Sequence, residues 1–354
     1  MNKKVIVGMS GGVDSSVTAI LLKEQGYEGE GVSLILFDPQ SRKALGKAPC
    51  CSVKAVVDAS KTADVIGIKH SHIDVRDLFS EKVIRPFIES YSKGLTPNPC
   101  ILCNKFIKFP SLIEAANARG FDFIATGHYA RVQSTGTGAQ LCRGLDNKKD
   151  QSYVLYALSR DIVNRLILPL GEKTKPAVRE IAHRLSLPSA NRPESQEICF
   201  IEERNYVAFM DGLAEEAKGP VIDIETKKQI GNHGGIHLYT IGQRKRLPAM
   251  GKPMYVVKID PSANAIYTGP REMAQMSAFT VQGVNWLVDP HSWHMSATVK
   301  VRSTMKDERA SLQIVDSKMV RVDYCEPQWA PSPGQSSVFY DGDIVLGGGV
   351  IAPY

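Results

Sequence analysis

The chain has 354 residues, of which 43% are hydrophobic and 23% charged, a composition typical of a folded protein with two or three domains. The net charge of +6 suits a polyanionic partner such as nucleic acid without requiring one. No apolar run approaches the roughly 20 residues of a membrane helix, and the first apolar stretch breaks at Gly8 before any signal-peptide pattern is complete. We therefore expect a cytoplasmic protein with no membrane partner.

The first two predicted elements are a β-branched strand at Val5–Gly8 and a helix that ends near Gln25. The loop between them contains SGGVDS, in which two glycines let the backbone approach an anion and Asp14 stands where a metal ion or a helix cap would be wanted. The helix N-terminus adds N–H groups and a positive dipole end, which suit a pyrophosphate. The alternative is a glycine-rich turn capped by Ser and Asp.

The loop differs from the best-known phosphate-binding loops. It lacks the Lys of a Walker-type loop, and the chain has no GxGxxG. The run SGGVDS resembles instead the PP-loop of the N-type ATP pyrophosphatases, enzymes that adenylate a substrate and release pyrophosphate.

Apolar strands alternate with helical segments from Lys4 to about Ile198, which predicts an α/β domain with a mostly parallel sheet. Ligands of such sheets bind beyond the carboxyl ends of the strands, where the loop Gly8–Ser15 and the turn Ala125–His128 would share one cleft. The polar segment 38–52 is predicted to be a mobile loop over that cleft. The other predicted strands are Gly31–Phe37, Lys69–Asp74 and Phe123–Thr126, and the predicted helices include Val53–Ile66, Val154–Leu158, Asp161–Leu168 and Pro176–Leu185.

The pattern changes after Cys199, where short strands such as Met254–Ile259 and Ala265–Tyr267 indicate a small β-rich module, entered through a helix at Asn205–Ala217. From about Ala278, turn-separated alternating strands predict a small antiparallel barrel. The predicted fold is therefore an α/β, PP-loop type parallel-sheet catalytic domain followed by two β domains. The predicted bounds are 1–204 for the catalytic domain, 205–276 for the small central β-rich domain and 277–354 for the C-terminal antiparallel β-barrel.

The chain has seven cysteines, an odd number without an export signal, which favours thiol chemistry or metal binding over a disulfide framework. Cys100 and Cys103 form a C-x-x-C that suits a zinc half-site, a redox pair or part of an iron–sulfur site. No second C-x-x-C exists to complete a four-cysteine zinc site, so we assign no metal ligands. The two lysines of CNKFIK would favour a thiolate, and the two prolines of TPNPC would keep the approach out of helix.

Cys199 lies in ESQEICFIEER, between two apolar residues that look like a buried strand. By itself it would be interpreted as a core cysteine, because the thiol is among the most buried side chains. Cys50 and Cys51 lie in the predicted loop and receive no role.

The motifs along essentially the whole chain strongly resemble, in order, those of the tRNA-specific 2-thiouridylase family. Members of this family replace the 2-keto oxygen of the wobble uridine in certain tRNAs with sulfur, using ATP and a cysteine persulfide. The stretches that carry the resemblance are the SGGVDS loop, NPCILCN, ATGHY at 125–129, GLDNKKDQSYVLY at 144–156, EICFI around Cys199, LYTIGQRKRL at 238–247, PGQSSVFY at 333–340 and GGGVI at 347–351.

The resemblance implies an ATP site with magnesium on the phosphates, since a metal ion neutralises charge as pyrophosphate departs. Leu34 would lie at the adenine side, where many relatives have Met, and Gly127 would close the far side. The loop residues implied in ATP binding are Gly8, Met9, Ser10, Gly11, Gly12, Val13, Asp14 and Ser15.

The resemblance also implies a sulfur-transfer pair. Cys199 would receive sulfur as a persulfide from a donor protein, a cysteine desulfurase or a sulfur-relay protein. Cys103 would be the partner thiol, which either resolves a mixed disulfide bond or frees hydrosulfide. Cys100 departs from the family pattern, which has Asp there, so an alternative is an iron–sulfur cluster held by Cys100, Cys103 and Cys199.

The tRNA would be bound around its anticodon, with the wobble uridine flipped out of its stack. Asn98, Pro99 and Cys100 would line the pocket for this base. Arg302 is followed by Ser303 where relatives often have Tyr, so a stacking contact is expected to be lost. The other implied tRNA contacts are His128, Lys149, Asp150, Gln151, Arg302 and Gln335. The basic run Arg244–Arg246, between Gly242 and a turn at Pro248, suits phosphate contacts.

Two other functions fit parts of the sequence. Argininosuccinate synthetase would keep an SGGxDS loop but needs no cysteine pair. A non-catalytic RNA-binding protein would use the basic C-terminal barrel and leave the loop without a role. Both explain fewer of the motifs than a thiouridylase does.

Overall fold

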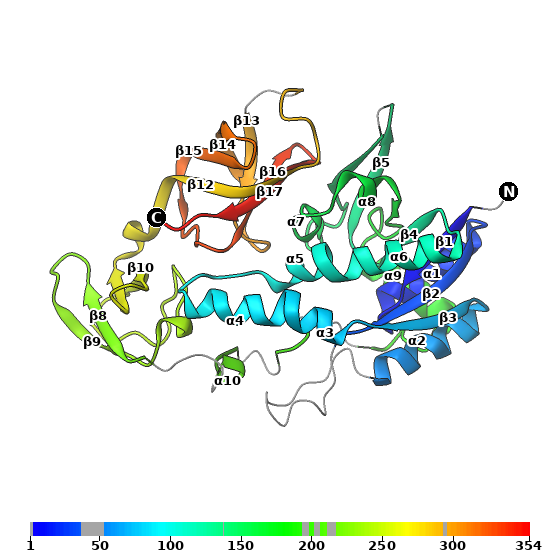
Figure 1. Cartoon of the computed structure of the whole chain (residues 1–354), viewed down its shortest axis with the longest axis horizontal. Coiled ribbons are helices and arrows are strands. Elements are labelled where there is room, and N and C mark those ends of the chain that lie inside the picture. The colour runs from blue at the N-terminus through cyan, green and yellow to red at the C-terminus, as the bar shows by residue number, and fades with distance from the viewer. Residues whose placement is uncertain are drawn as a thin grey trace. The chain divides into compact units, whose positions relative to one another are not determined.

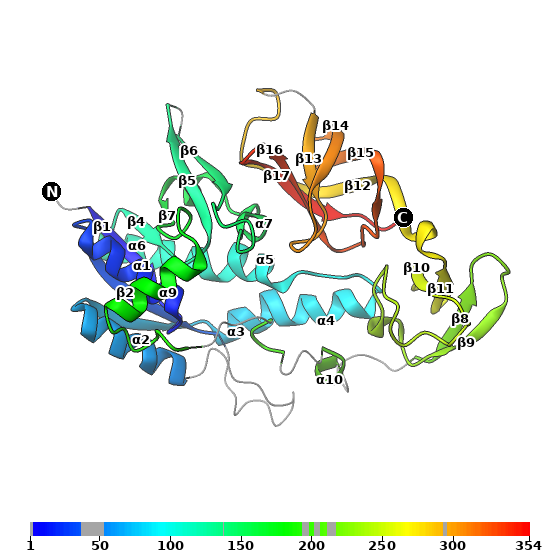
Figure 2. The same cartoon turned by 180° about the vertical axis from the view of Figure 1, so that it is seen from behind.

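The computed structural model describes residues 3–36, 53–136, 138–192, 198–201, 206–210, 217–292 and 296–354. These residues form two compact units (Figures 1 and 2). The first unit comprises Met1–Val83, Cys100–Asn205 and Asp343–Val345, and the second comprises Ile84–Pro99, Tyr206–Gly342 and Leu346–Tyr354. The predicted loop 38–52, with Cys50 and Cys51, lies outside the described residues, as does most of the predicted helix 205–217.

The first unit contains a 5-stranded sheet in the order β3-β2-β1-β4-β7, and all of its strand pairs are parallel. The chain enters the sheet at its centre, moves outward to β3 and then crosses to the other side at β4. The strand order therefore reverses between β1 and β4, the position at which sheets of this kind bind ligands. The strands are β1 (Lys4–Gly8), β2 (Glu28–Ile35), β3 (Lys69–Asp74), β4 (Phe123–Ala125) and β7 (Leu166–Ile167).

Helices cover both faces of this sheet (Figures 1 and 2). Val5 and Val7 pack in a core with α1, α2 and α9, whereas Ile6 points to the opposite face and is also fully buried. On that side α6 contacts β1 and β4. The helices of the first unit are α1 (Val13–Glu24), α2 (Val53–Ile66), α3 (Arg76–Phe79), α5 (Pro99–Cys103), α6 (Phe109–Arg119), α7 (Ser152–Leu155), α8 (Arg160–Asn164) and α9 (Lys175–Arg184).

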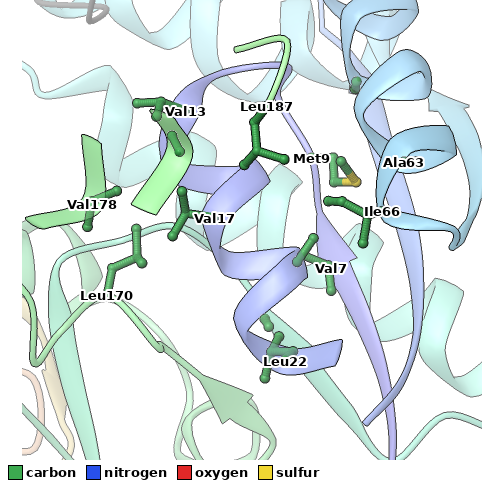
Figure 3. Packing of buried hydrophobic residues seen from close by; sticks show 14 of the residues in the cluster. Val7, Met9, Val13, Val17, Leu22, Ala63, Ile66, Leu170, Val178 and Leu187 are labelled. Atoms are coloured by element: carbon green, nitrogen blue, oxygen red, sulfur yellow. The ribbon is translucent and has the colours of Figure 1, made fainter. Parts of the chain in front are cut away.

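Figure 3 shows the core that fixes the start of α1. Val13 and Val17 on α1 contact Leu170, Val178 and Leu187, which come from the region around α9. On the other flank Met9 and Val7 pack near Ala63 and Ile66 of α2. Elements from three distant parts of the chain thus hold the loop that follows β1.

The predicted elements of this unit are mostly confirmed, but several segments differ from the prediction. Leu166–Ile167 was predicted to end a helix but forms β7, because β4 offers it a parallel partner. The hairpin of β5 (Ala130–Thr135) and β6 (Gly138–Arg143) was not predicted, since its strands are short and largely polar. Two π-helical turns, Ser80–Ile84 and Asn104–Lys108, are also unforeseen.

The second unit holds a four-stranded sheet, in the order β10-β11-β8-β9, and an antiparallel barrel. The barrel strands follow the order β12-β15-β14-β13-β16-β17, and a β12–β17 pairing closes it. The predicted fold class is therefore confirmed. The elements are α4 (Arg85–Ser92), α10 (Tyr206–Met210), β8 (Gly219–Asp223), β9 (Gln229–His233), β10 (Tyr255–Asp260), β11 (Ala265–Gly269), β12 (Gln275–Trp286), β13 (Ser296–Lys300), β14 (Glu308–Asp316), β15 (Met319–Trp329), β16 (Ser336–Asp341) and β17 (Ile344–Ile351).

Within the described residues, no helix has both the length and the apolar character that a membrane crossing would need.

Candidate active site

The loop between β1 and α1 is shaped by its glycines and serines. Gly11 has φ +74°, and a Cβ there would lie 2.6 Å from the carbonyl oxygen of Ala55. Gly12 is the N-cap of α1 in an extended conformation and gives the helix no side-chain cap. Ser15 Oγ accepts from the backbone N–H of Ser10 at 3.2 Å and donates to the Gly12 carbonyl at 3.1 Å. The result is a turn that presents the uncapped start of a 12-residue helix, which suits a phosphate group.

Arg192 holds the outside of this loop. Its Nη1 donates to the carbonyl of Gly11 at 2.9 Å and pairs with Asp58 Oδ2 at 3.0 Å. Ser189 Oγ also donates to Ser16 Oγ, at 2.8 Å. Neither contact could be expected from the loop sequence, because the partners come from distant segments of the chain.

Asp14 is the acidic residue of the loop, and two side chains hold it. Lys175 Nζ lies 2.7 Å from both of its carboxylate oxygens, and the hydroxyl of Tyr129 donates to Oδ1 at 2.7 Å. Lys175 could not be predicted from the sequence, because it stands 161 positions from Asp14 and belongs to none of the motifs described above.

Gly127 lies against the loop. A Cβ at this position would be 2.8 Å from the carbonyl carbon of Asp14 and 3.0 Å from the backbone nitrogen of Ser15. The approach follows from strand order, because β1 and β4 are neighbours with Val7 opposite Ala125. The structure therefore brings Gly127 and the loop together at the carboxyl ends of these strands, as the shared cleft requires.

Met9 and Leu34 differ in their exposure. Met9 is 2% exposed, its sulfur packs over Gly31, and its side chain lies in the hydrophobic core (Figure 3). Its backbone carbonyl accepts from Ser33 Oγ at 2.6 Å. Leu34 is half-buried on β2, the strand next to β1. Of these two side chains, only that of Leu34 retains surface for a base to contact.

His128 follows Gly127 and is buried. Its Nδ1 lies 2.8 Å from Thr126 Oγ1, and its ring lies 5.7 Å from that of Phe109. Burial lowers the pKa of His128 well below its ordinary value, and Lys108 acts in the same direction. The ring is therefore neutral at neutral pH.

The C-x-x-C is helical, in contrast to the extended segment before it. Pro99 is the first residue of α5, a position that proline tolerates, so Cys100 and Cys103 lie one helical turn apart. Cys103 is buried and Cys100 is exposed. Lys108 lowers the pKa of the Cys100 thiol, as the sequence predicted, but the surrounding protein atoms have the larger effect and raise it, although the side chain is exposed.

Asn104 follows Cys103 and opens a π-helical turn, a feature frequent at functional sites. Its side-chain Nδ2 donates to the carbonyl of Val154 at 2.9 Å. Its Oδ1 is buried and makes no hydrogen bond to any part of the chain that the structure describes. The hydrogen bond from Asn104 to Val154 anchors the helix that carries Cys103 to the segment after Gln151.

Cys199 lies in a turn and not in the predicted strand. The N–H of Ile201 donates to the carbonyl of Ile198 at 2.9 Å, which closes the turn. Phe200 is 1% exposed and packs edge-on against Phe79 of α3, with ring centroids 5.8 Å apart. The buried Phe200 therefore anchors the turn, while Cys199 itself is partly exposed.

A metal site made from the cysteines is not supported. The described residues contain no group of three or more His, Cys, Asp or Glu side chains that could hold a metal ion, so Cys100, Cys103 and Cys199 do not form one. The predicted disulfide bond is not seen in this structure, in which Cys103 and Cys199 are both thiols.

Two of the implied tRNA contacts, Asp150 and Gln151, make hydrogen bonds inside the first unit. The side chain of Asp150 is 4% exposed and accepts from the N–H of Gly144 at 3.0 Å and from the Oγ of Ser152 at 2.9 Å. Gln151 Oε1 accepts from the N–H of Tyr129 at 2.9 Å, and its own N–H donates to the Tyr129 carbonyl at 2.8 Å. Lys149 is partly exposed beside them.

The remaining implied tRNA contacts belong to the second unit, except Cys100. Arg302 Nη2 donates to the carbonyls of Ile241 and Ala330, both at 3.0 Å, so this guanidinium links connecting segments of the second unit. Gln335 and Asn98 are partly exposed, and Pro99 is buried. The run Arg244–Arg246 is exposed throughout.

Three family models match the chain. They are described as "tRNA methyl transferase HUP domain" for residues 3–203, "tRNA methyl transferase PRC-barrel domain" for residues 207–270 and "Aminomethyltransferase beta-barrel domain" for residues 276–351.

Similar proteins of known name match over almost the full length. A "tRNA-specific 2-thiouridylase MnmA" of Carboxydothermus hydrogenoformans is 46% identical, with 99% of this chain and 97% of that protein aligned. A "tRNA-specific 2-thiouridylase MnmA 1" of Caldanaerobacter subterraneus is 43% identical, with 99% and 98% aligned. One from Halothermothrix orenii is 42% identical, with 98% of each chain aligned.

Proposed function

Because the chain belongs to the tRNA-specific 2-thiouridylase family, we propose that it is a tRNA-uridine 2-sulfurtransferase. In this proposal it uses ATP to activate the 2-keto oxygen of the wobble uridine and replaces that oxygen with sulfur. The products are 2-thiouridine, AMP and pyrophosphate. The observation that carries the nucleotide half of the proposal is the contact of Gly127 with Asp14 and Ser15 at the reversal point of the parallel sheet.

The residues around this contact fit a nucleotide. The uncapped N-terminus of α1 faces the loop, and Gly11 and Gly127 leave no room for a side chain. The phosphates of ATP would lie on the N–H groups of the loop 8–15, with the base near Leu34. A magnesium ion bound with the nucleotide would neutralise the charge of the departing pyrophosphate.

Adenylation solves a specific chemical problem. A carbonyl oxygen is a poor leaving group, whereas the same oxygen bonded to the α-phosphorus leaves as AMP. The terminal sulfur of a persulfide on Cys199 would attack C2 of the uridine and expel AMP, leaving a disulfide between Cys199 and the base. Attack of the Cys103 thiolate on Cys199 Sγ would then release the thiocarbonyl and form a Cys103–Cys199 disulfide, which an external thiol must reduce.

The persulfide route is favoured over an iron–sulfur route. A cluster would need Cys100, Cys103 and Cys199 around one metal site, and the described residues contain no such group. Anaerobically purified protein that is fully active without iron would support the persulfide. A visible thiolate-to-iron absorption band that is lost in Cys100→Ser would contradict it.

The proposed tRNA interface uses the anticodon region of the substrate. Asn98, Pro99 and Cys100 would receive the flipped uridine, and the exposed Arg244–Arg246 run would contact phosphates. The neutral ring of His128 can form one hydrogen bond with the substrate without placing a charge beside it. Lys149, Gln335 and Arg302 remain proposed contacts, as do the internal residues Asp150 and Gln151.

Sulfur would come from a cysteine desulfurase or a sulfur-relay protein, in keeping with a cytoplasmic location. The proposed domain bounds are those of the sequence analysis, 1–204, 205–276 and 277–354.

The test is mass analysis of nucleosides from tRNA incubated with the protein, ATP, magnesium and a sulfide source. We expect thiolated uridine in the complete mixture and none without ATP. With a persulfide donor protein as the sulfur source, Cys103→Ala and Cys199→Ala should each abolish the product, while Cys325→Ala, an exposed cysteine of the second unit, serves as the matched control. Complete mixtures that bind ATP but yield no thiolated uridine would refute the proposal.

A further inference from the structure

Lys175 is a buried cation directed at the nucleotide loop. Its side chain is 8% exposed, and its Nζ lies 2.7 Å from both carboxylate oxygens of Asp14. Lysine is rarely buried to this extent unless it is paired, because removing an ammonium group from water is costly. The pairing with the loop is therefore the interaction that accounts for its position.

Contacts hold both the backbone and the ammonium group of Lys175 in place. It is the first residue of α9, where its N–H donates to Asp146 Oδ2 at 3.0 Å, and Pro176 follows it. Its Nζ also lies over the ring of Tyr129, 5.5 Å from the ring centre, and the hydroxyl of that ring donates to Asp14. The ammonium group thus has little freedom to leave the carboxylate.

The charge of Asp14 is a problem for an anionic ligand. Asp14 lies in the first turn of α1, the same helix end that is suited to bind phosphate. An uncompensated carboxylate there would repel a triphosphate, and the repulsion between two charges several ångströms apart in a protein site is substantial. The Lys175 ammonium cancels this charge at contact distance, so the helix end stays attractive to an anion.

We propose that Lys175 is a positioning residue of the nucleotide site, which neutralises and orients Asp14 so that the phosphate chain of ATP can approach the start of α1. The proposal rests on the proposed function, because it assumes that the loop binds ATP. It assigns Lys175 no contact with the reacting atoms.

If the proposal is right, the ATP affinities of Lys175 variants follow the net charge that each variant leaves in the loop. Lys175→Met leaves one net negative charge in the loop, whereas Lys175→Met combined with Asp14→Asn restores neutrality. We expect Lys175→Met to weaken binding of a non-hydrolysable ATP analogue about tenfold, with the double variant recovering most of the loss. Lys175→Gln, which keeps a hydrogen-bond donor without the charge, should weaken binding similarly and Lys175→Arg much less.

The experiment is calorimetric titration of the analogue with magnesium into each full-length variant, after circular dichroism has shown that it is folded. The affinity for tRNA, measured by filter binding, should stay within about twofold of wild type, because a counter-charge in the nucleotide loop acts on ATP alone. A double variant that binds no better than Lys175→Met, or an equal loss of tRNA affinity, would overturn the proposal. Should Lys175→Met fail to fold, Lys175→Gln and the charge-neutral double variant provide the same comparison.

The two proposals fail in different ways. If the wild-type protein does not bind the analogue, the proposed function fails. If the wild type binds it and Lys175→Met binds it equally well, only the role of Lys175 fails.

Discussion

The hydroxyl of Tyr129 donates a 2.7 Å hydrogen bond to Asp14 Oδ1 across 115 positions of sequence. The backbone of Tyr129 is in turn paired on both sides with Gln151. Asp14 belongs to the loop proposed to bind ATP, and Gln151 belongs to the segment proposed to meet tRNA. One tyrosine therefore connects the two, and its removal is a direct probe of the loop.

Tyr129→Phe deletes this hydrogen bond and leaves a charged acceptor with one fewer donor. We expect a loss of about 1–2 kcal/mol in the free energy of unfolding and a several-fold rise in KM for ATP. Denaturant unfolding and steady-state kinetics measure the two quantities. Tyr324→Phe is the matched control, because its hydroxyl donates to the Val299 carbonyl inside the barrel. It should lower stability without changing KM for ATP, and an equal change in both variants would contradict the expectation.

Gly127→Ala tests the contact between the β4 turn and the loop. The new methyl group would lie within 3.0 Å of Asp14 and Ser15 backbone atoms, so the turn or the loop must shift. We expect an increase in KM for ATP of about tenfold or more, with a loss of stability of about 1–3 kcal/mol. Gly136→Ala is the control, since a Cβ there has no neighbour within 4 Å in the described structure. Wild-type kinetics for Gly127→Ala would mean that this contact is unimportant to the nucleotide site.

Asp150→Ala tests whether Asp150 stabilises the folded protein or contacts the tRNA. The buried carboxylate accepts hydrogen bonds from two N–H groups and one hydroxyl, and their loss should cost about 2–3 kcal/mol of stability in the absence of tRNA. Thermal unfolding without tRNA measures this loss. Lys149→Ala should instead weaken tRNA binding, as removal of one phosphate contact does. A stable Asp150→Ala protein that has lost tRNA affinity would reverse this assignment.

The buried ring of His128 makes stability depend on pH. Since burial lowers the pKa of His128, the unfolded chain takes up a proton at this ring more readily than the folded protein does. The stability contributed by the neutral ring is therefore fully present above the ordinary histidine pKa of about 6.5 and is lost as the pH falls below it. The burial of His70 and His233 lowers their pKa values and adds to the same trend.

His128→Gln should flatten this dependence by at most about 1.4 kcal/mol per pH unit between pH 6.5 and 5. Denaturant unfolding at several pH values measures the slope. His291→Gln, at an exposed position, is the control and should keep the wild-type slope. An unchanged slope in His128→Gln would show that other groups control acid unfolding.

Much of the fold could be predicted because its signals are local. The β-branched run of β1 is enough to predict a buried strand there, and helix α2 follows from apolar spacing. Val53–Ile66 and Lys69–Asp74 were both predicted with the bounds that the structure has. The predictions failed where a partner decides the conformation. Leu166–Ile167 is a strand only because β4 lies beside it, and the residues around Cys199 form a turn because Phe200 is anchored on Phe79.

The loop that suits a phosphate, most of the strands and helices, and the family could all be predicted from the sequence, because each depends on residue types at short spacing. The surroundings of Asp14 could not, because they form only when the chain folds. Gly127 and Tyr129 reach Asp14 from the motif ATGHY, which the sequence marked without showing their contacts, and Lys175 reaches it from a segment that nothing in the sequence marked. The physical reason is that charge neutralisation and close backbone contact act through space, so they depend on how the sheet brings distant segments together and not on their distance along the chain.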